Sequence, residues 1–200
     1  KQLVEWLEKP TLALRRRGVR YVEVRSLDVD VFEPLGVSEE QLLFLGVLMR
    51  FCLLWGSPRI SPQERRAIDE NQVLAAHHGR DPALELDRGG RGVTLRAWAL
   101  ELLDAMAPLA ELLDGAAAGP RLAALRSQRA KVLEPDLTPS ARMLAAMRAN
   151  HEGVFHFARR LSERHRDFFL ARGIDPGRQA ELERLSEESR VRQAEIEAAD

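Results

Sequence analysis

Alternating apolar and polar positions mark one segment near the start of the chain as a β-strand. In residues 19–28, VRYVEVRSLD, Val22 and Val24 fall on one face and Glu23 and Arg25 on the other, because strand side chains repeat every two residues. A lone strand leaves its backbone hydrogen-bonding groups unpaired, and no other segment here has a comparable pattern. The pattern therefore predicts that its partners come from another part of a longer protein or from another polypeptide.

The remainder of the chain has the spacing and start signals of helices. Ser38 with Gln41, and Ser61 with Glu64, form capping-box patterns, and Thr94 is the predicted cap of a long helix. Glycines and Asp-Pro between about 81 and 92 predict an irregular connection. One helix is expected at 42–55, and a second is expected to begin at residue 62. A third runs from Thr94 to about residue 114. Further helices are expected at about 120–133, 139–150 (capped by Thr138), 152–171 and 178–198.

The opening residues already have an amphipathic pattern, with Leu3, Val4, Trp6 and Leu7 among polar neighbours. The first residue is Lys1 rather than methionine. Together with the unpaired strand, this start predicts a piece of a longer protein. Processing or removal of a tag would also explain the absence of methionine.

Composition describes a folded globular chain: 45% of the 200 residues are apolar and 30% are charged. With 30 basic and 31 acidic side chains, no overall field favours nucleic acid or an anionic membrane. Gly46 and Arg50 interrupt the longest apolar stretch, which predicts a core helix rather than a membrane span. Cys52, the single cysteine, is expected to be a buried thiol in that helix. We expect a cytoplasmic protein with no nucleic-acid or membrane partner.

Charge is distributed unevenly along the second half of the chain. Residues 121–172 carry 11 Lys or Arg against 5 Asp or Glu, and residues 174–200 carry 4 against 8. A phosphate-facing basic surface and a solvated surface partly neutralised by the acidic helix are both compatible with this pattern. The second interpretation is favoured because no aromatic residues interleave with the arginines, as a platform for single-stranded nucleic acid requires.

Glu23 and Arg25 are the sharpest candidates for chemistry. Two positions apart on a strand, they place a carboxylate beside a guanidinium group. A carboxylate can share Mg²⁺ with phosphate oxygens, and an arginine can hold a transferring phosphoryl group; a solvated or ion-paired strand face is the simpler interpretation. The five histidines have no i, i+4 pair for zinc, and CxxC, GxGxxG, GxxxxGK[ST] and GxSxG motifs are absent.

The segment 21–28, YVEVRSLD, closely resembles the corresponding motif of bacterial-type glutamate–cysteine ligases, and looser matches run across nearly the whole chain. Between about 83 and 130 the sequence departs from the family pattern, so no site is transferred there. Arg80 and Arg142 match motif positions but receive no role. The looser matches are Phe32, Pro34, Gly36-Val37, Phe44-Leu45, Cys52, Asn71 with Val73 and Leu74, Gly79-Arg80, Pro82, 136–142 and 195–200.

This resemblance implies that the chain is the C-terminal part of a ligase with a glutamine-synthetase-like fold. The expected fold class is α+β and mostly helical: residues 19–28 contribute one strand to a curved antiparallel sheet, and six to seven helices fill residues 38–200 of the same catalytic domain. The reaction implied is ATP-dependent ligation of the glutamate γ-carboxylate, through an acyl phosphate, to cysteine. Its products are γ-glutamylcysteine, ADP and phosphate, in the first step of glutathione biosynthesis.

For the site, the resemblance implies that Glu23 is a ligand of Mg²⁺ or Mn²⁺. Arg25 would bind the ATP phosphates and stabilise the transferred group as a catalytic residue. The other metal and substrate ligands of the family belong to an N-terminal part that this chain lacks, so we expect no activity from the chain alone. The alternative is a non-catalytic helical binding or scaffold domain, whose strand joins a partner's sheet and whose basic helices bind an anionic surface.

Overall fold

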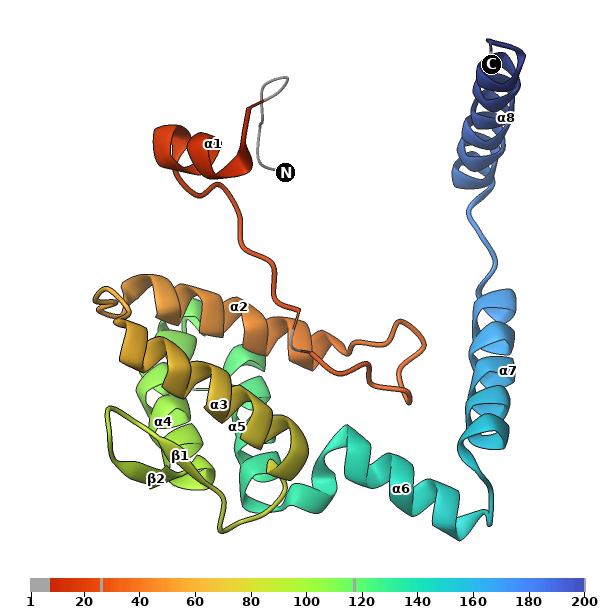
Figure 1. The fold of residues 1–200 in the computed structure, drawn as a ribbon. Coiled ribbons are helices and arrows are strands. Elements are labelled where there is room, and N and C mark those ends of the chain that lie inside the picture. Colours follow the sequence, from red (N-terminus) through yellow and green to blue (C-terminus); the bar gives the residue numbers. More distant parts are fainter. Residues whose placement is uncertain (1–7, 26, 117, 200) are drawn as a thin grey trace.

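The computed structural model describes residues 8–25, 27–116 and 118–199. This part of the chain is mostly helical with one small antiparallel sheet (Figure 1), so the predicted fold class is confirmed. The amphipathic start at residues 3–7 lies outside the described residues. The elements are α1 (Pro10–Arg17), α2 (Glu39–Leu54), α3 (Pro62–His78), β1 (Glu85–Asp87), β2 (Gly92–Thr94), α4 (Leu95–Asp114), α5 (Pro120–Leu133), the 3-10 helix η1 (Pro135–Leu137), α6 (Pro139–Ala149), α7 (Val154–Arg172) and α8 (Pro176–Ala199).

Side-chain caps begin three helices where the sequence predicts them. In α2 the Ser38 hydroxyl accepts from the Gln41 N–H at 3.1 Å, and the Gln41 side chain accepts from the Ser38 N–H at 2.8 Å. The same exchange joins Ser61 and Glu64 at the start of α3, and Thr94 caps α4. These contacts satisfy N–H groups that the first helical turn leaves unpaired. The Thr138 hydroxyl instead donates to a carbonyl oxygen of η1, so α6 begins without the predicted side-chain cap.

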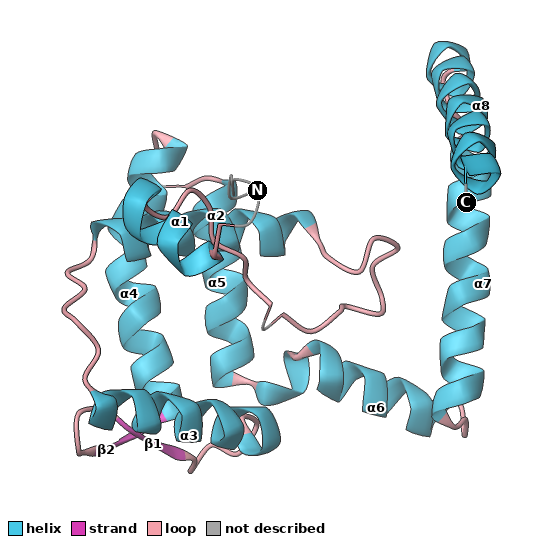
Figure 2. Ribbon diagram, turned by 45° about the horizontal axis from the view of Figure 1, so that its top comes forward, coloured by secondary structure: helices cyan, strands magenta, loops and turns pink. Residues whose placement is uncertain are grey.

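The hydrophobic core lies where α2 crosses the antiparallel pair α4 and α5 (Figure 2). Apolar side chains at helical spacing on each of the three helices turn toward the others, and burying them is the main stabilising contribution. The buried members are Val47, Phe51, Leu103, Met106, Ala110, Leu122 and Leu125.

The far end of α2 leaves this core, and the prediction for Cys52 is wrong. Cys52 is exposed because Val47 and Phe51, four positions apart, define the core-facing side of the helix. The next two residues, Leu53 and Leu54, are also exposed to solvent, over 83% and 73% of their surface. An apolar run alone therefore overestimated how much of this helix is buried.

A β-hairpin occupies the segment that was predicted to be irregular. Leu86 of β1 pairs with Val93 of β2 in antiparallel register. Gly89 and Gly90 form the turn with φ of 65° and 81°, a conformation that glycine adopts without steric cost. The glycines read as a loop signal are therefore the tight turn of a hairpin.

The predicted strand at 19–28 forms no ladder in the described part of the chain. Residues 19–25 and 27–28 are exposed, and the stretch between α1 and α2 is drawn as a loop (Figure 2). None of these residues exchanges a backbone hydrogen bond with another described residue. A strand requires a hydrogen-bonded neighbour, and in the described ranges β1 and β2 pair only with each other. The predicted strand is therefore not formed among the described residues, where this segment has no strand partner.

Helices α6, α7 and α8 form an arm that leads away from the core (Figure 1). Phe157 and Leu161 are buried in α7, whereas every described side chain of α8 is exposed. None of the helices in the described ranges is long and apolar enough to cross a membrane.

Candidate functional site

Glu23 and Arg25, the two predicted site residues, lie side by side. Arg25 Nε donates to Glu23 Oε2 at 2.9 Å, and Arg25 Nη2 contacts the same oxygen. The Arg25 side chain is 84% exposed and that of Glu23 47% exposed. An ion pair so open to water contributes little to stability, so both groups are free to exchange this contact for a ligand.

Glu23 offers one hard oxygen donor of the kind that Mg²⁺ prefers. A protein usually holds Mg²⁺ through one or two carboxylates, with phosphate oxygens and water completing the octahedron. Glu23 fits that requirement as one contributor. Within residues 8–25, 27–116 and 118–199, no group of three His, Cys, Asp or Glu side chains could hold a metal, so further donors would have to come from elsewhere.

Directly after this segment the chain enters a tight loop. Asp30 is only 7% exposed, and its Oδ1 accepts from the Phe32 N–H at 3.1 Å. The Asp30 N–H donates to the Gly36 carbonyl oxygen at 2.9 Å and closes the loop. Gly36 has φ 72°, and a Cβ there would lie 3.0 Å from Val29 Cγ1. Both the backbone conformation and the space therefore favour glycine.

Arg142 of α6 packs over the same loop. Its guanidinium carbon lies 4.4 Å from the centre of the Phe32 ring, and its Nη1 lies 4.0 Å from Asp30 Oδ2. Phe32 in turn meets Phe157 of α7 edge to face, with ring centres 6.2 Å apart. Three elements distant in the sequence thus converge just after the candidate site segment.

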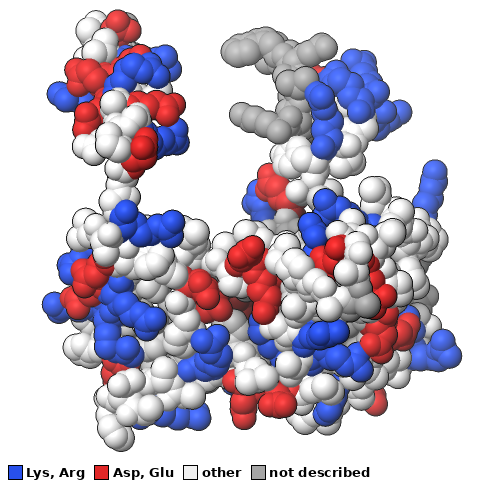
Figure 3. Space-filling view, turned by 180° about the vertical axis from the view of Figure 1, so that it is seen from behind, with Lys and Arg blue, Asp and Glu red and all other residues white. Residues whose placement is uncertain are grey.

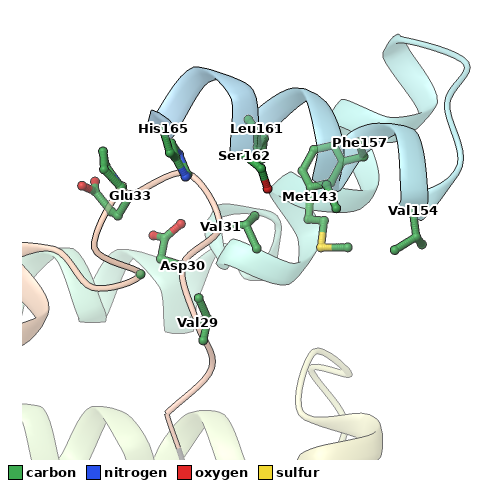
Figure 4. Close-up of a pocket in the computed structure, with 13 residues that line it drawn as sticks. Val29, Asp30, Val31, Glu33, Met143, Val154, Phe157, Leu161, Ser162 and His165 are labelled. Carbon is green, nitrogen blue, oxygen red and sulfur yellow. The ribbon is translucent and has the colours of Figure 1, made fainter. Parts of the chain in front are cut away.

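A cavity of about 400 Å³ lies between this loop and the helical arm (Figure 4). Val29, Val31 and Leu161 contribute to its apolar wall. Asp30 and His165 point into it from opposite sides (Figure 4). The buried Nε2 of His165 has no hydrogen-bond partner among the residues that the structure describes.

Asn71 and Arg80, which match the looser motifs, make no hydrogen bond or ion pair with Glu23 or Arg25. The Asn71 Nδ2 donates to the Asp87 carbonyl oxygen at 2.7 Å, and its Oδ1 accepts from the Asp87 N–H at 2.9 Å. This exchange attaches the hairpin to α3. Arg80 is exposed in the loop after α3, with no ion-pair partner among the described residues.

Sequence reasoning missed the role of Asp30. An aspartate that precedes Pro34 and Gly36 in a short segment is a turn signal. That signal could have predicted the loop, but not the contact with Arg142.

Comparison with known proteins finds similarity to glutamate–cysteine ligases. Residues 1–74 match the family model described as glutamate-cysteine ligase. The glutamate–cysteine ligase of Alcanivorax borkumensis is 39% identical over 194 residues, covering 96% of this chain and 37% of that protein. The enzyme of the same name from Pseudomonas paraeruginosa is 41% identical over 191 residues, covering 95% of this chain and 36% of that protein.

A solved structure gives the same result. The 2.0 Å crystal structure of a glutamate–cysteine ligase from Francisella tularensis, in complex with AMP, matches with a TM-score of 0.82 and 32% identity, covering 100% of this chain and 39% of that one. Each of these relatives is named as a ligase. More narrowly, the chain is similar to the C-terminal part of bacterial glutamate–cysteine ligases, and the resemblance read from the sequence is confirmed. It spans just over a third of the length of the curated relatives it matches.

Proposed function

We propose that this chain is the C-terminal part of an enzyme that uses ATP and Mg²⁺ or Mn²⁺ to join glutamate to cysteine. The product is γ-glutamylcysteine, in the first step of glutathione biosynthesis. The observation that carries this proposal is the Glu23–Arg25 pair, exposed on an extended segment whose backbone is unpaired in the described chain. The match to glutamate–cysteine ligases over 96% of the chain supports it.

The proposed reaction has two steps. An oxygen of the glutamate γ-carboxylate attacks the γ-phosphorus of ATP, and ADP leaves, which gives an acyl phosphate. The cysteine amine then attacks the acyl carbon, the nitrogen loses a proton, and phosphate leaves as the amide forms. Both steps carry negative charge on phosphoryl oxygens, which must be offset by cationic groups.

Arg25 and Glu23 offset that negative charge in different ways. Arg25 donates hydrogen bonds from a planar fork to the phosphoryl oxygens as they leave ATP. Glu23 holds the divalent cation, which when bound offsets phosphate charge. Both residues first exchange their mutual contact for these ligands, at little cost because the pair is exposed.

The chain alone is proposed to be inactive because the site segment has no neighbouring strands within residues 8–25, 27–116 and 118–199. The test is glutamate- and cysteine-dependent phosphate release from ATP and Mg²⁺, measured with this chain and with a version extended to its natural start codon. Activity only in the extended protein supports the proposal. No activity in either favours the scaffold alternative, which salt-sensitive binding to nucleic acid would then support.

Variants of the extended protein test the two roles separately. Glu23→Ala should raise the Mg²⁺ concentration needed for half-maximal rate, and Arg25→Ala should lower kcat by about 10²–10³-fold, as for other lost transition-state donors. Arg20→Ala is the matched control, since Arg20 is exposed on the same segment without an ion-pair partner among the described residues. Unchanged kinetics in both Glu23→Ala and Arg25→Ala would refute these roles.

A further inference from the structure

We propose that Arg142 is a positioning residue for the reaction. Its contacts with Asp30 and Phe32, the Arg142 lock, hold the loop at residues 30–36 against α6. They thereby set the direction in which the segment carrying Glu23 and Arg25 enters the active site. This inference rests on the proposed function, because it assigns Arg142 to the same site. It is carried by the contacts of Arg142 with Asp30 and Phe32.

The lock depends on a carboxylate that is almost fully withdrawn from water. A buried carboxylate is unfavourable unless it is hydrogen-bonded and near a positive charge. Asp30 receives the Phe32 N–H at 3.1 Å and lies 4.0 Å from the Arg142 guanidinium group. Asp30 as a whole residue is only 7% exposed, so a nearby positive charge is needed to stabilise its ionised form.

Arg142 suits this task through its shape as well as its charge. Its guanidinium group packs over the Phe32 ring, with 4.4 Å from the guanidinium carbon to the ring centre, while one edge faces Asp30. A planar guanidinium can stack on a ring and face a carboxylate together, whereas a lysine ammonium is a compact point charge. Phe32 also touches Phe157, so one side chain joins the loop to both α6 and α7.

The lock lies shortly after Glu23 and Arg25 in the sequence, and it can therefore affect where these two side chains lie. Residues 19–25 and 27–28 make no backbone hydrogen bond to other described residues, so the loop is the first hydrogen-bonded fixed point after Arg25. Asp30 lies five residues further on, about 17 Å along an extended chain at ~3.3 Å per residue. Figure 4 shows Asp30 and Val31 pointing from the loop toward α7. A change in the angle of the loop is carried along the segment to Arg25, and misplacement by about 1 Å can cost a hundredfold in rate.

The test uses the complete, extended protein and compares Arg142→Ala, Arg142→Lys and the control Arg148→Ala. Arg148 is exposed on the same helix, with no ion-pair partner found in the described part of the chain. We expect Arg142→Ala to lower kcat at least tenfold with a much smaller change in the KM for ATP. Arg142→Lys should recover only part of the loss, and Arg148→Ala should match the wild type.

Addition of millimolar guanidinium separates positioning from simple destabilisation. The free cation can refill the space between Phe32 and Asp30 and should restore part of the kcat of Arg142→Ala, while sodium at the same ionic strength should not. A protein that is merely destabilised should gain no activity from guanidinium, because this cation weakens rather than strengthens a fold. An unchanged kcat in Arg142→Ala, or a loss that guanidinium fails to restore, would overturn the proposal.

Hydrogen exchange distinguishes failure of the lock from failure of the proposed function. Arg142→Ala should speed amide exchange in residues 28–37 but not in α4 or α5, whether or not the protein is a ligase. Equal exchange in the variant and the wild type would overturn the lock. Absence of glutamate- and cysteine-dependent phosphate release in the complete wild-type protein would instead overturn the proposed function.

Discussion

At the scale of single residues, Asp114 shows how a buried carboxylate joins two helices. It ends α4, yet its oxygens accept the N–H groups of Arg121 and Leu122 at the start of α5, at 3.1 and 3.0 Å. Burial of the carboxyl raises its pKa, but the hydrogen bonds from Leu122 and Arg121 outweigh this effect, so the pKa of Asp114 lies below its usual value. A Cβ on Gly119 would collide with the Asp114 carboxylate, so this junction also requires a glycine.

This pKa shift predicts a pH dependence of stability. A carboxyl whose pKa is lower in the folded state stabilises the fold above the unfolded value of about 3.9, and this contribution is lost as the pH falls through the folded value. The difference in unfolding free energy between the wild type and Asp114→Asn should therefore be largest near pH 7 and shrink below about pH 4. Denaturant unfolding at both pH values measures it.

The control for this prediction is Asp104→Asn on the same helix. Asp104 pairs with Arg129, but its side chain is 65% exposed, so the substitution should have little effect at either pH. A pH-independent difference for Asp114→Asn would contradict the assignment of its hydrogen bonds to the ionised form.

At the scale of elements, α8 is held by contacts within itself. Figure 3 shows acidic and basic side chains mixed along it. Arg178 pairs with Glu181 and Arg190 with Glu187, one turn apart. Such pairs each add a few tenths of a kcal/mol to a helix. Because its described side chains are all exposed, α8 adds no buried surface to the core.

Deletion of residues 175–200 should therefore leave the stability of the remaining chain nearly unchanged. We expect the free energy of unfolding to change by less than about 0.5 kcal/mol, as for surface changes away from special features, while helical circular dichroism falls. Phe157→Ala in α7 is the contrasting variant: its side chain is 1% exposed, and such truncations cost about 3–5 kcal/mol. A loss of unfolding free energy of that size on deletion of residues 175–200 would show that α8 packs against the rest of the protein.

At the scale of the whole molecule, the far end of α2 exposes apolar surface that a complete fold would be expected to cover. Leu53, Leu54 and Trp55 are exposed in sequence, and Trp55 packs only partly against Phe51, with ring centres 4.9 Å apart. The unpaired segment 19–25 adds free backbone groups. Contiguous apolar surface and open strand edges both favour association between molecules.

The chain alone should therefore self-associate as its concentration rises. Sedimentation velocity across a concentration series should show a growing sedimentation coefficient, and the double variant Leu53→Glu, Leu54→Glu should reduce it. Leu112→Glu is the matched control, since Leu112 is an equally exposed leucine on α4. A monomer at all concentrations would show that the exposed apolar end of α2 does not mediate self-association.

The sequence by itself determined the features that depend on near neighbours. Ser38 and Ser61 mark helix starts because a capping box closes within four residues. The proximity of Glu23 and Arg25 follows from their spacing on an extended backbone. The resemblance to glutamate–cysteine ligases could be recognised for the same reason, since the main motif, residues 21–28, is one short continuous segment.

Only the tertiary structure decided the features that depend on distant partners. The hairpin at 85–94 was missed because its strands are three residues long and its glycines also fit a loop. Cys52 was misplaced because packing against α4 and α5 selects which face of α2 is buried. The contact of Asp30 with Arg142 could not be predicted, because burial and charge pairing between segments far apart in the chain exist only once the helices have packed.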